Sequence, residues 1–238
     1  MKSLKYKDKI ALIAPSLNVG EEELQNSIKT LKRIGLTGIP LNFGKTDEEK
    51  AKEFMKAFTD DEFDAVFCLR GGYGASRLIP FIDFDIIKPK IFLGYSDVTS
   101  LHLAIAKFCG FPTFHGPMPA VDLTRRSQIS ILFRKIKPQN VTGGNLSIVT
   151  SSLGTPYEVE TSGKMLFLEE VNEPLYKIDR MITQLRHAKK LENEIVLGHF
   201  SSDEKKRISK KVMEELIGKK CISFPSGHLY PNKTLVMS

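Results

Sequence analysis

Short apolar runs alternate along the first half of the chain with segments whose apolar residues recur every three or four positions. The unbroken apolar runs predict strands that are buried on both faces, and the three-to-four spacing predicts amphipathic helices. This alternation favours a parallel sheet with helices on both faces, the α/β class. The expected strands are 9–16, 65–69 and 91–93, and the expected helices are 21–34, 46–58 and 98–108, the last with Val98, Leu101, Ile105 and Phe108 facing inward.

The alternation lapses around residues 117–126, and the second half mixes its elements differently. We therefore expect a first domain at 1–118, a linker at 119–140 and a second domain at 141–238. Within the second domain the patterns predict helices at 146–153, 176–188 and 203–217, strands at 164–168 and 194–198, and a strand-like end at 236–238.

Composition narrows the classes of function. The formal charge is +7, but no lysine cluster is interleaved with exposed aromatics and Trp is absent, so a nucleic-acid platform is poorly supported. No apolar run is long enough to cross a bilayer, and the N-terminus lacks the apolar core of an export signal. Three widely spaced cysteines suit the reducing cytoplasm, and no His or Cys pair has the spacing of a zinc site. We expect no metal, no cofactor and no membrane partner.

Ser96 stands between an apolar strand and a helical pattern, in the stretch Gly94-Tyr95-Ser96-Asp97. A nucleophilic serine occupies such a strand-to-helix corner in hydrolases, although Val98 breaks the full G-x-S-x-G spacing. The free N–H groups of the helix start, including that of Asp97, could stabilise an oxyanion. The alternative is that Ser96 or Asp97 only caps the helix.

A glycine-rich corner, Arg70-Gly71-Gly72-Tyr73-Gly74, ends the preceding strand. The phosphate-loop interpretation is weak, because Arg77 stands where G-x-G-x-x-G requires glycine. Consecutive glycines can instead turn a backbone N–H toward the serine of the neighbouring strand, since adjacent strands lie about 4.8 Å apart. A tight turn without a chemical role is the alternative.

A nucleophilic serine requires a base and a group that orients the base. His115, His199 and His228 each follow an apolar strand, whereas His102 and His187 lie within helical patterns and are expected to be packing or surface residues. Spacing favours His228 over His199 only mildly, because a loop suits a catalytic group. Glu169 and Glu170 end an apolar strand, and the inward-facing one requires a hydrogen-bond partner.

These motifs together resemble the LD-carboxypeptidases, a family of serine peptidases that includes muramoyltetrapeptide carboxypeptidases and microcin C immunity peptidases. The motifs follow the family's order over nearly the whole chain. They are Ala14-Pro15-Ser16, residues 70–78, residues 94–101, Gly143-Gly144-Asn145-Leu146, Gly154-Thr155-Pro156, residues 166–174, Ile178-Asp179-Arg180, and Gly227-His228 with Asn232, Thr234 and Leu235.

The resemblance implies that Ser96 is the nucleophile, His228 the general base and Glu169 the orienting carboxylate. It also implies an oxyanion hole formed by backbone N–H groups at Gly71, Gly72 and Asp97, a Rossmann-like first domain and a smaller β-rich α+β second domain. The implied enzyme is a cytoplasmic homodimer that releases terminal D-alanine from murein tetrapeptide through an acyl-enzyme. Arg70 is a weak candidate for binding the substrate carboxylate.

Two alternatives stay open. An immunity-type peptidase of the same family would cleave a peptide-nucleotide antibiotic. A non-catalytic binding module would keep the fold without a competent pocket. The second alternative is motivated by a shorter segment than the family has between the helix after Ser96 and Gly143, and by an end at Ser238 where members continue.

Overall fold

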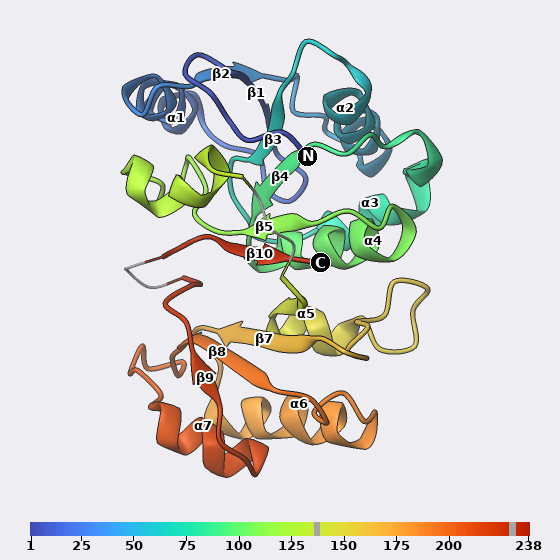
Figure 1. The fold of residues 1–238 in the computed structure, drawn as a ribbon, viewed down its shortest axis with the longest axis vertical. Helices are drawn as coiled ribbons and strands as arrows, with labels where there is room; N and C mark the ends of the chain where they lie inside the picture. Colours follow the sequence, from blue (N-terminus) through green and yellow to red (C-terminus); the bar gives the residue numbers. More distant parts are fainter. Residues whose placement is uncertain (136–138, 229–231) are drawn as a thin grey trace.

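The protein is built on two sheets, one above the other in Figure 1. The computed structural model describes residues 1–135, 139–228 and 232–238. The first sheet has the strand order β10-β5-β4-β3-β1-β2, and all its neighbours are parallel except β10 and β5. Its strands are β1 (Lys9–Ile13), β2 (Thr37–Pro40), β3 (Ala65–Cys68), β4 (Ile91–Gly94), β5 (Thr113–His115) and β10 (Leu235–Met237).

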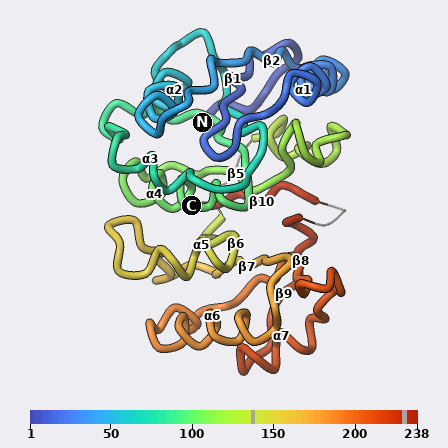
Figure 2. The backbone as a smooth tube through the Cα atoms, turned by 180° about the vertical axis from the view of Figure 1, so that it is seen from behind, coloured from blue at the N-terminus to red at the C-terminus, as the bar shows by residue number. Residues whose placement is uncertain are grey.

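Helices cover both faces of the first sheet (Figures 1 and 2). Leu24 and Leu31 of α1 (Glu21–Arg33) pack on one face, with the 3₁₀ segment η4 (Arg126–Phe133) beside them. The other face is covered by α2 (Asp47–Thr59), α3 (Ala75–Leu78) and α4 (Thr99–Phe108). Short 3₁₀ turns connect these elements: η1 (Ile79–Phe81), η2 (Phe84–Ile86) and η3 (Ser96–Val98).

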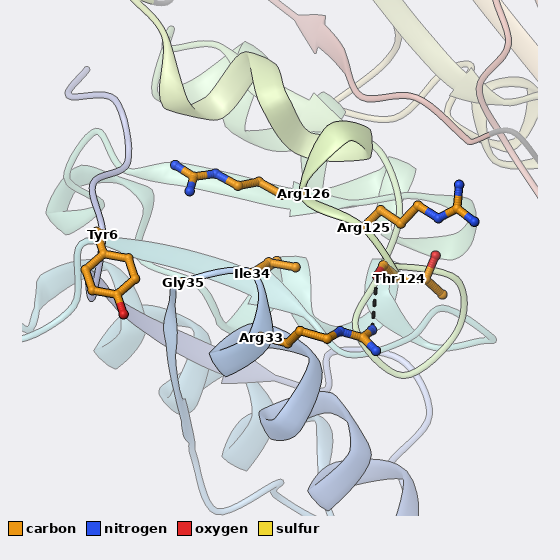
Figure 3. Close-up of a pocket in the computed structure, with 7 residues that line it drawn as sticks. All are labelled: Tyr6, Arg33, Ile34, Gly35, Thr124, Arg125 and Arg126. Atoms are coloured by element: carbon orange, nitrogen blue, oxygen red, sulfur yellow. Dashed lines mark hydrogen bonds between the residues drawn. The ribbon is translucent and has the colours of Figure 1, made fainter.

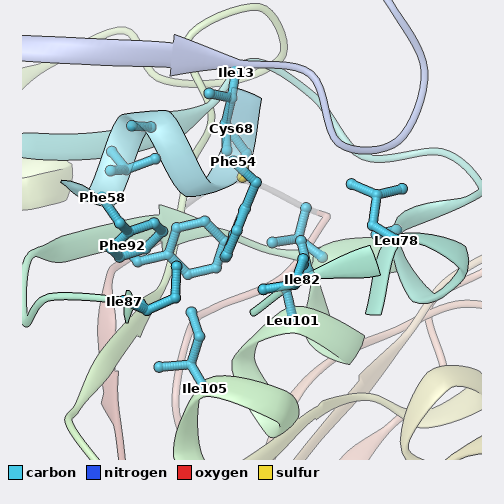
Figure 4. Packing of buried hydrophobic residues seen from close by; sticks show 14 of the residues in the cluster. Ile13, Phe54, Phe58, Cys68, Leu78, Ile82, Ile87, Phe92, Leu101 and Ile105 are labelled. Atoms are coloured by element: carbon cyan, nitrogen blue, oxygen red, sulfur yellow. The ribbon is translucent and has the colours of Figure 1, made fainter. Parts of the chain in front are cut away.

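An aromatic cluster fills the layer between α2 and the sheet (Figure 4). The ring centroid of Phe54 lies 4.8 Å from that of Phe58 and 5.7 Å from that of Phe92, and all three side chains are fully buried. Phe92 comes from β4, the strand that leads directly into Ser96. The cluster therefore fixes the strand that positions the candidate nucleophile.

The second sheet is smaller, parallel throughout and ordered β6-β7-β8-β9. One face packs against the apolar stripe of α6, formed by Ile178, Ile182 and Leu185. Its strands are β6 (Val141–Asn145), β7 (Met165–Glu170), β8 (Ile195–Phe200) and β9 (Ile222–Ser223), and its helices are α5 (Leu146–Ser151), α6 (Leu175–His187) and α7 (Lys210–Ile217).

The last strand, β10, is an edge strand of the first sheet, on the side nearest the second sheet in Figure 1. Leu235 and Met237 of β10 pack with Val141, Phe167 and Val196 of the second sheet in one buried cluster. Because side chains alternate along a strand, Phe167 and Glu169 share the face of β7 that is turned toward this cluster. Leu166 and Leu168 point the other way, toward α6.

The α/β fold class is confirmed, with a mostly parallel sheet under two helical layers and a second, smaller sheet. Two details of the pattern were wrong. Phe108 is 43% exposed rather than inward, because α4 ends there and the chain turns at Cys109. Helix α7 begins only at Lys210, since Ser201 and Arg207 pair across a turn in the segment expected to be helical.

The boundaries 1–118, 119–140 and 141–238 stay a prediction, and residues 136–138 of the expected linker lie outside the described residues. Strand β6 was missed by the pattern, because it contains Gly143 and Gly144, whereas the apolar strand expected before His115 is β5, which includes His115 as its last residue. None of the helices in the described part of the chain combines the length and apolar character that crossing a lipid bilayer requires.

Removal of the Phe92 ring is expected to destabilise the fold strongly. Phe92→Ala should lower the free energy of unfolding by about 3–5 kcal/mol, because the ring is fully buried and its neighbours can close the cavity only in part. Urea denaturation measures the change. Phe81→Ala is the matched control, since Phe81 is 44% exposed and its loss should cost less than about 1 kcal/mol. Equal costs for the two variants would contradict this packing.

Candidate active site

Ser96 begins the 3₁₀ turn η3 directly after β4 and has a φ of +66°. A non-glycine residue with positive φ costs about 1–3 kcal/mol and is concentrated at functional sites, including the nucleophile corner of hydrolases. Ser96 is half-buried, so its hydroxyl is held at the surface of a rigid corner. The capping alternative is wrong: neither η3 nor α4 has a side-chain cap, and the Asp97 carboxylate bonds elsewhere.

The glycine corner after β3 lies against Ser96, because β3 and β4 are parallel neighbours. A Cβ atom at position 71 would stand 2.9 Å from the Ser96 Cβ and 3.2 Å from the Ser96 Oγ. Gly72 has a φ of +133°, and a Cβ there would lie 2.6 Å from the Leu17 side chain. This close approach, rather than a turn alone, requires glycine at both positions.

The Asp97 side chain links three loops next to Ser96 by hydrogen bonds. Its carboxylate accepts a hydrogen bond from the Ser16 hydroxyl at 2.6 Å and another from the Ala75 N–H at 2.9 Å. Ser16 follows β1, and Ala75 begins the short helix after the glycine corner. Asp97 is buried, so these bonds act away from competing water. They hold the Ser96 corner, the glycine corner and the end of β1 as one unit.

Glu169 of β7 and His228 of the loop after β9 form a hydrogen-bonded pair. The Glu169 Oε2 atom lies 2.8 Å from the His228 Nδ1 atom, and the Glu169 side chain is fully buried. Two glycines make room for the carboxylate: a Cβ at Gly198 would lie 2.8 Å from the Glu169 Cβ, and one at Gly227 would lie 2.7 Å from Oε2. Gly227 immediately precedes His228, so the loop is pressed onto the carboxylate.

The pair shifts both pKa values. Burial favours the neutral carboxyl of Glu169, but the charge and hydrogen bond of His228 outweigh it and lower the Glu169 pKa. Burial also disfavours a charged His228, and here Glu169 outweighs it and raises the His228 pKa above 6.5. The pKa of Glu170 is raised, first by burial and then by Glu169. Glu170 is held separately by the Ser147 hydroxyl at 2.6 Å.

The His228 ring packs beside the serine corner. Its centroid lies 4.8 Å from that of Tyr95, the residue before Ser96, in an edge-on arrangement. Among the residues that the structure describes, Ser96 Oγ forms no hydrogen bond with the His228 ring. Catalytic hydrogen bonds often tighten only when substrate is bound. The geometry thus pairs Glu169 with His228 and places the His228 ring against Tyr95, while the role of Ser96 stays a prediction.

The loop that carries His228 is held by residues that sequence reasoning missed. The Asn232 side chain donates to Asp122 Oδ2 at 2.6 Å, and its Oδ1 accepts the Gly227 N–H at 3.1 Å. Asp122 lies in the expected linker, and its pKa is raised by burial. Asn232 belongs to the recognised Gly-His-x-x-Pro-Asn motif, which was the available signal; residues 229–231 lie outside the described part.

The other histidines divide as follows. His187 is exposed, and His102 is buried in packing, where its ring bonds to Thr113 and to the Gly94 carbonyl. His199 is buried on β8, and burial lowers its pKa. His115 is fully buried, and its Nε2 atom lies 3.9 Å from Glu169 Oε1. It is therefore a second histidine at the carboxylate.

Arg70 is the first residue of the glycine corner and is partly exposed. Its guanidinium lies 3.5 Å from Glu23 Oε1, while its Nε is buried without a hydrogen-bond partner among the described residues. The side chain is thus near the corner but is already engaged by an acidic residue.

A separate cavity of about 340 Å³ lies at the end of α1 (Figure 3). The described residues that line it include no carboxylate, thiol or histidine, so we do not assign it to the reactive site. Its lining residues are Tyr6, Arg33, Ile34, Gly35, Thr124, Arg125 and Arg126. Within residues 1–135, 139–228 and 232–238, no group of three or more His, Cys, Asp or Glu residues could hold a metal ion.

A serine with positive φ at a strand-to-helix corner and a hydrogen-bonded histidine–carboxylate pair are features typical of hydrolases. Comparison with known families specifies this class. The N-terminal domain of the LD-carboxypeptidases matches residues 10–116, and their C-terminal domain matches residues 140–238. The chain belongs to the LD-carboxypeptidase family of peptidases.

Individual relatives agree with this assignment. A probable murein peptide carboxypeptidase of Bacillus subtilis is 36% identical over 80% of this chain and 70% of its own length. The microcin C7 self-immunity protein MccF of Escherichia coli is 26% identical over 93% of this chain and 85% of its own length. The solved muramoyltetrapeptide carboxypeptidase of Oxalobacter formigenes has a TM-score of 0.84 at 28% identity, covering 96% of this chain and 92% of that one.

Gly71→Ala tests the contact between the two corners. The added methyl would lie too close to Ser96, so the corners must separate, and the reaction of Ser96 with a fluorophosphonate should slow at least about tenfold. Mass spectrometry of the labelled protein over time gives the rate. Gly20→Ala is the control, because a Cβ there meets its nearest neighbour at 3.7 Å and should leave the rate unchanged. An unchanged rate in Gly71→Ala would contradict the arrangement.

Glu169→Gln tests the electrostatics of the pair. The carboxylate stabilises the protonated ring, so its loss leaves burial as the main influence and should move the His228 pKa below its value in the parent protein. An NMR titration of the His228 ring measures the midpoint. Glu170→Gln, which removes a buried carboxylate bonded to Ser147 and Asn145, should shift the midpoint much less. A higher midpoint in Glu169→Gln would refute this account of the pair.

Proposed function

We propose that the protein is a serine carboxypeptidase in which Ser96 is the nucleophile, His228 the general base and Glu169 the residue that orients the base. The single observation that carries the proposal is the 2.8 Å bond between Glu169 and His228, made beside the strained Ser96 corner. A histidine whose Nδ1–H is bound to a carboxylate presents the unprotonated Nε2 to a serine hydroxyl, as the triad mechanism requires.

The proposed reaction proceeds in two halves. His228 Nε2 takes the Ser96 proton as Oγ attacks the carbonyl carbon of the scissile amide, and the oxyanion is bound by backbone N–H groups at Gly71, Gly72 and Asp97. The C–N bond then breaks, and His228 returns the proton to the departing amine. In the second half a water gives a proton to His228 Nε2 and attacks the ester carbon, the C–Oγ bond breaks, and His228 returns the proton to Ser96 Oγ, which releases the carboxylic acid product.

The proposed substrate is a murein tetrapeptide, cleaved at the L,D bond that joins its terminal D-alanine. The names of relatives support this class, because the B. subtilis relative is a probable murein peptide carboxypeptidase and the O. formigenes neighbour a muramoyltetrapeptide carboxypeptidase. The free carboxylate of D-alanine requires a cation near the scissile bond. Arg70, two residues from Gly72, is a weak candidate, because Glu23 already engages it.

A second candidate is the immunity-type activity, cleavage of an amide in a peptide-nucleotide antibiotic. The likeness to MccF favours keeping it, since the match extends over 93% of this chain. Parallel assays with a murein tetrapeptide and a peptide-nucleotide substrate separate the two. We further propose, on the family resemblance, a cytoplasmic homodimer.

Ser96→Ala should abolish release of D-alanine from the tetrapeptide, with a loss of about 10⁶-fold in kcat, because Ser96 Oγ is the atom proposed to form the acyl-enzyme. Chromatography of the products measures the release, and circular dichroism checks that the variant is folded. Ser162→Ala, in an exposed turn, is the control and should retain full activity. Undiminished activity in Ser96→Ala would reject the serine mechanism, and a folded parent without activity on either substrate would favour a binding module.

A further inference from the structure

His115 is a fully buried histidine at the carboxylate that the proposed mechanism leaves unused. It ends β5, one strand away from Ser96 in the first sheet, and its ring packs edge-on against Phe167 at 4.9 Å. Its Nε2 atom is buried without a hydrogen-bond partner among the described residues, and Glu169 Oε1 lies 3.9 Å away. An unpartnered buried nitrogen is costly, so its place requires an explanation.

The two carboxylate oxygens of Glu169 differ in how well they are hydrogen-bonded. Oε2 is bonded to His228 at 2.8 Å. Among the described residues, Oε1 has only the Asn145 amide as a donor, at 3.4 Å, and the same amide nitrogen lies closer to Glu170, at 2.9 Å. A fully buried carboxylate is stabilised only when both oxygens are bound to donors. The nearby His115 Nε2 is the second nitrogen that could supply a donor to Oε1.

The neighbours of the ring favour the tautomer that supplies this donor. His115 Nδ1 lies 3.1 Å from the Ser226 hydroxyl, which is also 3.3 Å from Asn232 Oδ1. Asn232 Oδ1 already accepts the Gly227 N–H at 3.1 Å. The Ser226 hydroxyl has one proton, for which Asn232 Oδ1 and His115 Nδ1 compete as acceptors; Nδ1 is the nearer of the two, and Oδ1 already accepts the Gly227 N–H. Donation to Nδ1 places the ring proton on Nε2, next to the negative Glu169.

We propose that His115 is a positioning residue of the reaction proposed above, a neutral donor whose Nε2–H faces Glu169 Oε1 at 3.9 Å, stabilises its charge and so keeps Oε2 on His228. The same ring bonds through Nδ1 to Ser226, two residues before His228. His115 therefore holds both the carboxylate and the loop that carries the base. Glu169 lies between two histidines, one that titrates and one that stays neutral.

The surroundings keep His115 neutral. Burial lowers the His115 pKa to about 4, against an opposing influence of Glu169. The titratable and charged groups that face it are Glu169 of β7, His228 of the loop, Tyr95 after β4 and His102 of α4. Tyr95 stays neutral because burial raises its pKa. Burial lowers the His102 pKa to about 3, so it adds no charge.

The first test uses the unmodified protein and requires no activity. The ¹⁵N chemical shifts of the His115 ring report which nitrogen carries the proton. At neutral pH we expect the proton on Nε2 and a lone pair on Nδ1. A proton on Nδ1, or a doubly protonated ring, overturns the proposal, whether or not the protein proves to be a carboxypeptidase.

The second test compares His115→Phe with His115→Gln. Phe keeps a ring and removes the donor, which concentrates the Glu169 charge on His228, so the His228 midpoint should rise by about half a pH unit. Labelling of Ser96 by a fluorophosphonate at pH 7 should slow about tenfold, because less of the base is neutral and its partner is less fixed. Gln can place an amide N–H near the former Nε2 and should restore both quantities toward the parent values.

A role in packing alone predicts a different result. A damaged core would slow labelling in both variants without moving the His228 midpoint, and Gln, the more polar residue, would be the worse replacement. An unmoved midpoint in folded His115→Phe, or equal behaviour of the two variants, overturns the proposal. If His115→Phe does not fold, the ring tautomer of the unmodified protein decides alone.

Discussion

The structure depends on one buried interaction, the bond between Glu169 and His228. A carboxylate taken fully out of water is costly, by several kcal/mol even after the protein relaxes, unless partners restore what water supplied. Here the partners are a histidine whose pKa rises in response and the Asn145 amide. The glycines at 198 and 227 allow the loop to approach this closely. Gly198 and Gly227 thus both allow the hydrogen bond between Glu169 Oε2 and His228 Nδ1.

In the proposed mechanism the pair can act on Ser96 only if the two sheets are fixed to one another. Strand β10 belongs to the first sheet by hydrogen bonding, and it packs on the second sheet through Leu235 and Met237. Asn232, just before β10, ties the His228 loop to Asp122 after β5. The serine corner is fixed independently by Asp97 and by the aromatic cluster under β4. The His228 loop and the Ser96 corner are therefore each fixed by a separate set of contacts.

Much of this could be predicted from the sequence, for identifiable reasons. Unbroken apolar runs gave β3 and β4, and because parallel neighbours end at the same edge, Gly71 and Ser96 were expected to meet. The motifs around Glu169 and His228 carried a family resemblance, and the pairing of those two residues followed from it. The pattern alone left His199 almost equal to His228, since periodicity does not report which loops converge.

Other features lay beyond pattern reasoning. The positive φ of Ser96 is a consequence of the assembled corner, and the backbone preference of serine does not predict it. Asp122 and His115 are single residues in segments without strong periodicity, and their roles arise from contacts with residues more than a hundred positions away. Phe108 has the spacing of an inward residue, but it is the last residue of α4 and its side chain is 43% exposed.

The central claim is that the Glu169–His228 pair acts on Ser96. Its most direct test is a crystal structure of the protein after reaction with a fluorophosphonate. The account predicts phosphorus on Ser96 Oγ, with a phosphoryl oxygen about 2.7–3.1 Å from backbone nitrogens of the glycine corner or Asp97. It also predicts His228 Nε2 within about 2.6–3.2 Å of an adduct oxygen while Nδ1 stays on Glu169. An adduct on another residue, or a His228 ring turned away from Ser96, would contradict it.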